Sequence, residues 1–222
     1  PDSLSQFEGN ADFVATEGNS IKKFVWTFNN KVAPFDDIKV RQGLYTAINR
    51  EALLKAVWGD YGTVIGSMPP VSEPWYDASF AEIHAYNPEK AKALLEEAGV
   101  KDLSFGIKYV VSDWNEIIVQ QLKSDLAAVG VTLNLQAIDD STWYEDVYTN
   151  KDYETTLMDH NNPRDVLWYA NPNFYWQYDN AEVQALAVSA EEAGTFEEQV
   201  ADIHTLSKII ANEAPSAWLF LA

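Results

Sequence analysis

Residues Pro34–Pro70 read PFDDIKVRQGLYTAINREALLKAVWGDYGTVIGSMPP, and this stretch predicts two short helices packed end to end. Pro34 and the aspartates that follow it place a fixed turn and negative charge at the start of the first helix. Asn49 can cap the second helix, and Gly59 can end it. The first helix has one apolar face, because apolar residues recur every four positions at Val40, Leu44 and Ile48.

Downstream of this stretch the pattern alternates between strands and helices, which is typical of an α/β sheet with helices on its faces. The segment Leu103–Ile138 predicts a βαβ unit, whose two strands should be parallel. Its helix should begin at Asp113, with Glu116 completing a capping box. Pro69–Tyr86 predicts a long ordered loop. Further elements are predicted as strands at Lys23–Asn29, Tyr153–Met158 and Ala217–Leu221, and as helices that open at Asn87, Thr142 and Thr195.

Composition excludes several classes of function. The 222 residues carry a formal net charge of −19, which disfavours nucleic acid and anionic membrane surfaces as partners. The sequence contains no cysteine, so disulfides, zinc–thiolate sites and thiol catalysis are excluded. It also contains no HExxH, EF-hand or GxxxxGK(S/T) pattern. We therefore expect neither a metal nor a nucleotide cofactor.

Three predicted strands end in polar clusters, at Ser112–Asn115, Asp139–Ser141 and Asp159–Asn162. If these strands are parallel neighbours, the three clusters meet on one rim, where open α/β sheets bind their ligands. Helix capping is the competing explanation for Asp113 and for the second cluster, because both stand where helix caps belong. Asp159 has no helix to cap within the next two residues, so it is the strongest candidate for ligand contact.

Two motifs carry a resemblance to a known family. The run Pro34–Glu51 resembles PF-x-D-x-(x)-VRQ-A-L-x-x-A-I-x-(R/K)-E, a pattern of the solute-binding proteins of peptide-type ABC transporters (oligopeptide, dipeptide and nickel; family 5). Met158–Leu167, MDHNNPRDVL, resembles the GD-x-x-(D/N)-P-D-x-x-L loop that lines the cleft in that family. In peptide-binding members, the aspartate that matches Asp159 holds the ammonium group of the peptide. Two residues depart from the pattern, since Thr156 replaces a tryptophan and Arg164 replaces an aspartate.

The resemblance implies a periplasmic-binding-protein-like lobe of type II, peptide-binding class, with a mixed sheet and helices on both faces. It implies that residues 1–222 form a single lobe, the C-terminal ligand-binding lobe of a larger two-lobe protein. The first lobe, a signal segment and a lipid anchor would then precede this chain. The protein would work outside the cytoplasm, in the periplasm or at the cell surface. Its partners would be a small solute and the membrane permease subunits of an ABC importer.

The predicted ligand contacts combine the polar loop after the third parallel strand with residues near the other two strand ends. They are Trp114, Asn115, Trp143, Asp159, His160, Asn161, Asn162 and Arg164. Aromatic faces can stack on sugars or cover apolar peptide side chains. We expect at most two or three of seven aromatic residues to contact the ligand, from Trp114, Trp143, Tyr144, Trp168, Tyr169, Tyr175 and Trp176. A peptide is the preferred cargo, and an oligosaccharide is the alternative.

A glycoside hydrolase is a less favoured alternative. It would pair Asp159 with Asp139 or Asp140, because neighbouring strand ends could separate two carboxyl groups as glycosidases require. Carboxylates are abundant in this chain, so such a pair arises easily by chance, and we expect a binding protein rather than an enzyme. Among the histidines, His204 should be a packing residue, and His160 should be either a ligand contact or a solvated loop residue.

Overall fold

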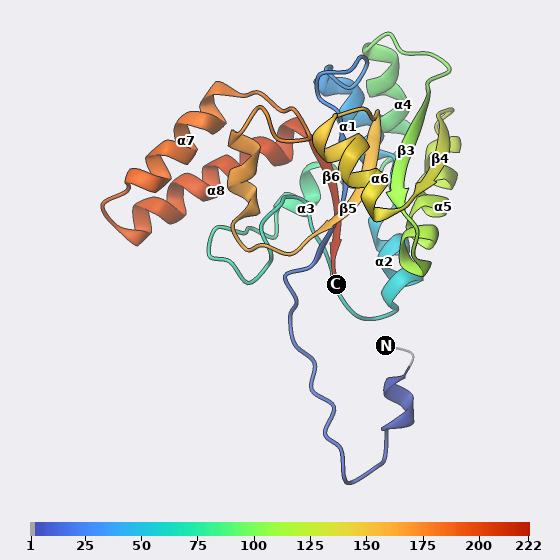
Figure 1. The fold of residues 1–222 in the computed structure, drawn as a ribbon, viewed down its shortest axis with the longest axis vertical. Coiled ribbons are helices and arrows are strands. Elements are labelled where there is room, and N and C mark those ends of the chain that lie inside the picture. Colours follow the sequence, from blue (N-terminus) through green and yellow to red (C-terminus); the bar gives the residue numbers. More distant parts are fainter. Residues whose placement is uncertain (1–2) are drawn as a thin grey trace.

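A mixed sheet of six strands organises residues 3–222, the part of the chain that the computed structural model describes (Figure 1). The strands are β1 Lys23–Phe28, β2 Thr63–Val64, β3 Ser104–Val110, β4 Thr132–Ile138, β5 Thr155–His160 and β6 Ser216–Leu221. Their order across the sheet is β2-β6-β1-β5-β3-β4. β3 pairs in parallel with both β4 and β5, whereas β1 runs antiparallel to β5 and β6. The predicted mixed α/β sheet is therefore confirmed, and the condition that three strands are parallel neighbours is met.

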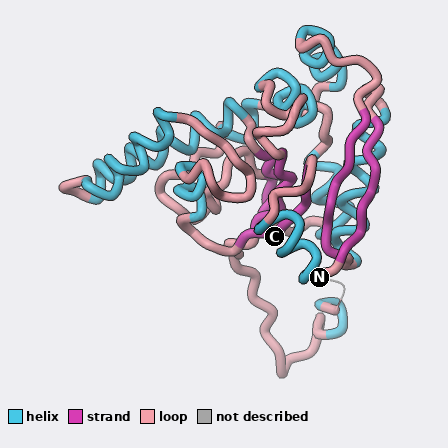
Figure 2. The backbone as a smooth tube through the Cα atoms, turned by 45° about the horizontal axis from the view of Figure 1, so that its top comes forward, coloured by secondary structure: helices cyan, strands magenta, loops and turns pink. Residues whose placement is uncertain are grey.

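Helices cover both faces of this sheet (Figures 1 and 2). One face carries α2 Arg50–Trp58 and α5 Asp113–Ala127, with α1 Ile38–Thr46 and α4 Pro88–Glu97 beside them. The other face carries α6 Asp140–Trp143, the π-helix Tyr144–Thr149 and the 3-10 helix Asp165–Ala170. β3 makes the division visible, because Tyr109 reaches Glu116 of α5 while its neighbour Lys108 reaches Asp146 of the π-helix.

Two helices, α7 Ala181–Glu192 and α8 Phe196–Glu213, project from the side of the sheet as an antiparallel hairpin (Figure 1). The capping box predicted for α8 is confirmed, because Thr195 and Glu198 exchange their side-chain-to-backbone hydrogen bonds. α7 was not predicted, since its buried side rests mainly on small residues and gives little apolar periodicity. The short α3, Phe80–Ile83, interrupts the segment predicted as a loop. Within residues 3–222, no helix is both long enough and apolar enough to cross a bilayer.

Local capping residues fix where most helices begin. Asn49 accepts a hydrogen bond from a backbone N–H of the first turn at 3.0 Å, as the sequence predicts. Asp37, predicted only to place negative charge at the start of its helix, also acts as a cap and accepts from a backbone N–H at 2.8 Å. The cap predicted for α5 is wrong by one residue. Ser112 is the extended residue before that helix, and its Oγ accepts from a backbone N–H at 3.1 Å. Asp113 is already helical, and Glu116 accepts from a tyrosine hydroxyl instead of closing a capping box.

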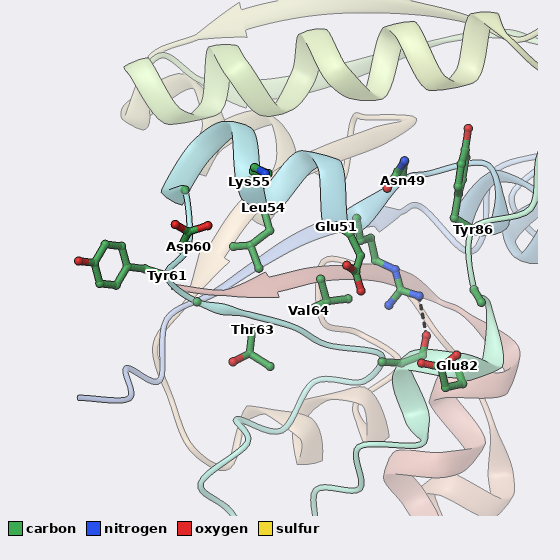
Figure 3. A pocket seen from close by; sticks show the side chains of 15 residues that line it. Asn49, Glu51, Leu54, Lys55, Asp60, Tyr61, Thr63, Val64, Glu82 and Tyr86 are labelled. Atoms are coloured by element: carbon green, nitrogen blue, oxygen red, sulfur yellow. Dashed lines mark hydrogen bonds between the residues drawn. The ribbon is translucent and has the colours of Figure 1, made fainter. Parts of the chain in front are cut away.

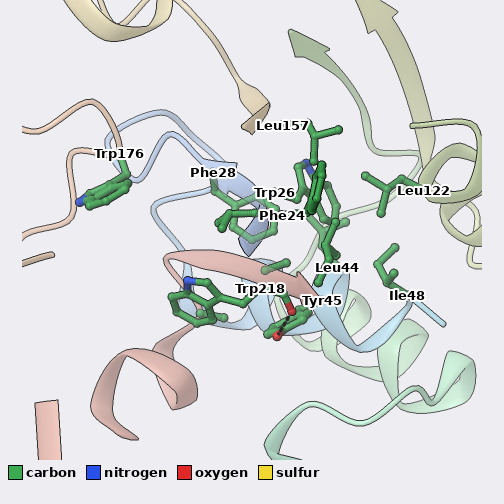
Figure 4. Packing of buried hydrophobic residues seen from close by; sticks show 14 of the residues in the cluster. Phe24, Trp26, Phe28, Leu44, Tyr45, Ile48, Leu122, Leu157, Trp176 and Trp218 are labelled. Carbon is green, nitrogen blue, oxygen red and sulfur yellow. Dashed lines mark hydrogen bonds between the residues drawn. The ribbon is translucent and has the colours of Figure 1, made fainter. Parts of the chain in front are cut away.

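Aromatic residues of β1 and β6 form the centre of the hydrophobic core (Figure 4). Trp26 and Trp218 are completely buried, and the ring of Phe24 stacks on that of Phe220 with centroids 4.9 Å apart. Tyr45 of α1 donates its hydroxyl to the carbonyl oxygen of Trp218 at 2.6 Å (Figure 4). Each large apolar side chain buried in this way stabilises the fold by about 1.5–3 kcal/mol. β1 is therefore anchored in the core, and it pairs directly with β5.

Candidate functional site

The carboxyl ends of β3, β4 and β5 lie at one edge of the sheet, as the parallel pairing requires. The first residue of β1 and the last residue of β6 reach the same edge, because Lys23 pairs with both His160 and Leu221. The chain therefore enters and leaves the sheet at this edge (Figure 1). Ligands of open α/β sheets bind beyond the carboxyl ends of the strands, so we call this the ligand edge.

Asp159 stands at the ligand edge on the face of the sheet that carries α5. It is directly opposite Phe24 in the antiparallel pairing of β5 with β1, and opposed residues project from the same face. Its side chain is 31% exposed, so one side of the carboxylate is open to solvent. The ammonium of Lys22 lies 3.4 Å from Asp159 Oδ2, and the amide of Asn161 donates to the same oxygen at 3.3 Å.

Trp114, at the start of α5, lies close to this carboxylate and is 40% exposed. The ammonium of Lys22 is 5.3 Å from the ring centroid of Trp114 and 5.3 Å from that of Phe24. The indole also contacts Trp58 of α2, with ring centroids 4.8 Å apart. Carboxylate and aromatic faces therefore surround one ammonium group. Asn115 does not join this group, because its amide donates to the carbonyl oxygen of Val110 at 2.8 Å and holds the start of the helix.

His160 and Trp143 lie on the opposite face of the sheet from Asp159. His160 is the last residue of β5 and is 9% exposed, so the expectation of a solvated loop residue is wrong. Its Nε2 is 2.7 Å from the hydroxyl of Tyr175, whose ring stacks on the imidazole. Burial lowers the pKa of His160 to about 4, which leaves the ring neutral at pH 7. Trp143 is also buried, and its Nε1 donates to Thr156 Oγ1 at 2.8 Å.

These two residues form part of an aromatic groove with a volume of about 740 Å³. The groove is bounded by the π-helix, β5 and the 3-10 helix, and it is lined by Trp143, Tyr144, Tyr148, Met158, His160, Leu167, Trp168, Asn171, Phe174 and Tyr175. Tyr144 is 58% exposed and Trp168 37% exposed, so the groove opens to solvent. Its lining suits an apolar or aromatic group of a ligand. Tyr169 and Trp176, two other aromatic candidates, are fully buried and stack on each other instead.

A buried ion pair fixes the loop that follows Asp159. Lys23 donates to both carboxylate oxygens of Asp165 at 2.8 and 2.7 Å, and to the carbonyl oxygen of Asn162 at 2.7 Å. Both side chains of the pair are 0% exposed. Burial raises the pKa of Asp165 to about 6 and lowers the pKa of Lys23, although each partner's charge acts in the opposite direction. The side chain of Arg164 leaves this loop and lies over Trp75, 5.4 Å from its ring centroid.

Apart from Asn115, which holds the start of α5, the predicted site residues are thus divided between three places. Asp159 and Trp114 lie together at one face of the ligand edge, His160 and Trp143 lie in the groove on the other face, and Asn161, Asn162 and Arg164 occupy the exposed loop between them. The sequence reasoning missed Lys22, Lys23 and Asp165. Their signals are weak, because the two lysines are adjacent at a strand start and Asp165 looks like an ordinary polar loop residue.

The carboxylates at the end of β4 belong to a helix start. Asp139 Oδ1 accepts from the backbone N–H of Thr142 at 2.7 Å and from the hydroxyl of Ser141 at 2.8 Å. These hydrogen bonds lower the pKa of Asp139. β3 lies between β4 and β5, so Asp139 and Asp159 are at the ends of strands that are not neighbours. The capping explanation is confirmed for Asp139. In residues 3–222, no cluster of three or more acidic or histidine side chains is arranged to hold a metal ion.

A second cavity of about 580 Å³ lies between α2, β2 and α3 (Figure 3). Its labelled lining includes Glu51, Lys55, Asp60 and Glu82, so charges of both signs face it. Arg50, the buried cation in its wall, donates to the carbonyl oxygens of residues 65, 81 and 84. Arg50 is therefore used to hold loops against α2, and the ligand edge remains the stronger candidate.

A mixed sheet of this order, with helices on both faces and an open edge where the chain enters and leaves, defines a lobe of the type II periplasmic-binding-protein class. A profile of the family described as bacterial extracellular solute-binding proteins, family 5 (middle part), matches residues 1–181. The chain belongs to this family. The family recognition and the fold class expected from the sequence are therefore confirmed.

Individual relatives agree with this assignment. Over 136 residues the chain is 35% identical to di/tripeptide-binding protein 2 of Pseudomonas aeruginosa. The matched region covers 59% of this chain and 25% of that protein. Over 114 residues it is 35% identical to haem-binding protein A of Haemophilus influenzae, covering 48% of this chain and 20% of that protein. Its fold matches the oligopeptide-binding protein AppA of Bacillus subtilis, solved with a nonapeptide, at a TM-score of 0.87 and 21% identity. That match covers 99% of this chain and 48% of AppA, so the chain spans about half the length of the solved protein and less of the other two.

Proposed function

We propose that this chain is one lobe of a solute-binding protein that binds a peptide through its free amine and delivers it to an ABC importer. The observation that carries the proposal is the arrangement at Asp159. A half-buried carboxylate and two aromatic faces surround an ammonium at the edge of the sheet where ligands bind. The amine of a peptide has the same charge and hydrogen-bonding capacity as the lysine ammonium.

The aromatic groove supplies the second part of the proposed site. It opens at the same end of β5 as Asp159 but on the other face of the sheet. A peptide whose amine lies at Asp159 would place an apolar or aromatic side chain in this groove. His160 supports this role, because its neutral ring adds no charge to the lining at pH 7. We therefore expect peptides with an aromatic residue to bind more tightly than those with only small residues.

The two-lobe organisation is also a proposal. It is supported by the share of AppA that the chain covers and by the adjacent positions of the β1 start and the β6 end. In such a protein, a second lobe would close over the ligand edge by a hinge motion and contact the solute from the other side. Closure would remove water and strengthen the interaction of Asp159 with the amine. The closed pair, outside the cytoplasm and held by a lipid anchor, would be the form that the permease subunits recognise.

An oligosaccharide is the alternative cargo, because the groove offers exposed aromatic faces on which sugar rings can stack. A hydrolase is not proposed, since the carboxylate of Asp139 caps a helix. The dependence of binding on Asp159 distinguishes a peptide from an oligosaccharide. A peptide amine depends on the charge of this residue, whereas a neutral sugar does not.

The test is calorimetry on the complete protein with the tripeptides Ala-Ala-Ala and Ala-Phe-Ala, maltotriose and haemin as ligands. Asp159→Asn should weaken peptide binding by about 10- to 100-fold, the value of a charge-assisted hydrogen bond. Asp140→Asn, at an exposed acidic residue in the first turn of α6, is the matched control and should leave the affinity unchanged. Binding of maltotriose or haemin alone, unchanged in Asp159→Asn, would contradict the peptide proposal.

A further inference from the structure

We propose that Lys22 is an internal competitor for the amine site, so that a solute amine must displace its ammonium from Asp159 before it can bind. This inference rests on the proposed function and adds a residue that determines affinity and selectivity. Lys22 lies directly before β1, at the ligand edge, and its ammonium is 3.4 Å from Asp159 Oδ2. A second cation cannot take this position while the first remains.

The surroundings of the Lys22 ammonium are those of a binding site for a cation. The carboxylate of Asp159 lies on one side, and the faces of Phe24 and Trp114 lie at 5.3 Å from the nitrogen to each ring centroid. Aromatic faces attract ammonium groups within about 6 Å of their centroids. Trp114 is held in place by Trp58, so the site keeps its shape when the lysine leaves.

Comparison with the adjacent lysine shows which of the two can be displaced. Lys23 is 0% exposed and makes three hydrogen bonds of 2.7–2.8 Å to Asp165 and Asn162. Lys22 and Asp159 are each 31% exposed, and their closest charged atoms are 3.4 Å apart. A partly exposed pair at this distance is weak, because solvent screens it and the long side chain loses entropy. Lys23 is therefore a fixed structural residue, and Lys22 is the exchangeable one.

The main chain of Lys22 allows the exchange without movement of the sheet. Its carbonyl oxygen accepts from the backbone N–H of Ala222 at 2.9 Å, and its own N–H donates to Ser20 Oγ at 2.9 Å. The backbone is thus tied to β6 and to the preceding segment. Rotation about the side-chain bonds alone takes the ammonium into solvent, which costs little for a lysine that is already partly exposed.

This arrangement makes the affinity depend on the ligand's charge. A solute with a free amine gains Asp159 but must first break the Lys22 pair, so its affinity is reduced by the strength of that pair. A solute without a cation leaves the Lys22–Asp159 pair intact, so the pair does not change its affinity. Removing Lys22 should therefore strengthen the binding of free amines selectively.

The test compares Lys22→Met with Lys39→Met in the complete protein. Lys39 is the matched control, because it also forms an ion pair at 3.4 Å, with Glu97 at the end of α4, and no residue of the ligand edge takes part in that pair. The ligands are the tighter of Ala-Ala-Ala and Ala-Phe-Ala and the N-acetylated form of the same peptide. Lys22→Met should bind the free peptide about tenfold more tightly, a value set by an exposed ion pair and its cation–π contacts. Neither Lys39→Met nor the acetylated peptide should show a gain.

A second readout follows the lysine itself. Reductive ¹³C-methylation keeps the charge of each lysine, and the signal of Lys22 should carry a ring-current shift that Lys22→Met identifies by its absence. Addition of the free peptide should remove that shift, and addition of the acetylated peptide should not. If the wild type binds the peptide but Lys22→Met binds it equally or more weakly, or the shift persists in the complex, the inference is wrong while the proposed function stands. If neither peptide binds the wild type, both are wrong.

Discussion

The buried pair of Lys23 and Asp165 should be the most sensitive point of the ligand edge to substitution. Asp165→Asn keeps the size of the side chain but removes the charge that faces the Lys23 ammonium, at 2.7 and 2.8 Å from the two carboxylate oxygens. Both side chains are 0% exposed, so no solvent replaces the lost partner. Removal of one partner of such a pair costs about 3–5 kcal/mol of the free energy of unfolding.

The double variant Lys23→Met/Asp165→Leu provides the control for this reasoning. It removes both charges and fills the site with apolar atoms, and such replacements are often neutral or stabilising. We expect its stability to lie within about 1 kcal/mol of the wild type, well above that of Asp165→Asn. The raised pKa of Asp165 supports this expectation. It means that burial destabilises the charged carboxylate by more than the Lys23 ammonium stabilises it.

The assay is urea denaturation followed by circular dichroism, with thermal unfolding as a second measure. For a domain of this size, the loss in Asp165→Asn corresponds to a decrease in Tm of roughly 6–20 °C. Two results would refute the reasoning. One is an Asp165→Asn variant within about 1 kcal/mol of the wild type, and the other is a double variant as unstable as the single one.

Three further predictions concern other positions. Gly66→Ala should cost about 3 kcal/mol in urea denaturation, because its Cβ would lie 2.1 Å from the Phe80 carbonyl oxygen. Gly18→Ala, with no atom within 4 Å of the added Cβ, should be neutral, and equal stabilities of the two variants would contradict this. His160 has a folded-state pKa of about 4 against an ordinary 6.5, so the stability it contributes is lost as the pH falls through this range. The stability difference between wild type and His160→Phe should therefore shrink by about 3 kcal/mol from pH 7 to pH 4, and a constant difference would disprove it. Trp143→Phe loses the hydrogen bond to Thr156, which should cost about 1 kcal/mol of the free energy of unfolding. It should also weaken binding of Ala-Phe-Ala more than binding of Ala-Ala-Ala, and equal weakening would show that the groove does not hold the aromatic side chain.

Much of the fold could be predicted because its signals are local. Asn49 and Thr195 cap the helices that the sequence assigns to them, and each acts on a backbone N–H three residues away. The parallel pairing of β3 with β4 followed from the single helix that connects them, whereas the place of β5 beside β3 was only a condition of the predicted site. α7 was not predicted because its apolar residues show little helical periodicity, and the α5 cap was misplaced because Ser112 and Asp113 are both good capping residues.

The candidate site could be predicted only in part, because its contacts join distant segments. Asp159 was identified from its position after a strand, but its partner Lys22 comes from the other end of the chain. The pair of Lys23 and Asp165 spans 142 residues and leaves no periodic signal. His160 was expected in a loop, yet Tyr175 covers it and makes it part of the groove. Such packing depends on strand order, which local sequence patterns do not specify.

The most direct test of the ligand edge is a crystal structure of the complete protein with Ala-Phe-Ala bound. We expect the peptide amine at Asp159, about 2.7–2.9 Å from a carboxylate oxygen, with the Lys22 ammonium moved into solvent and the phenyl ring in the groove beside Trp143. A peptide bound away from the carboxyl ends of β3, β4 and β5, with Lys22 still paired to Asp159, would contradict the assignment of this edge as the solute site.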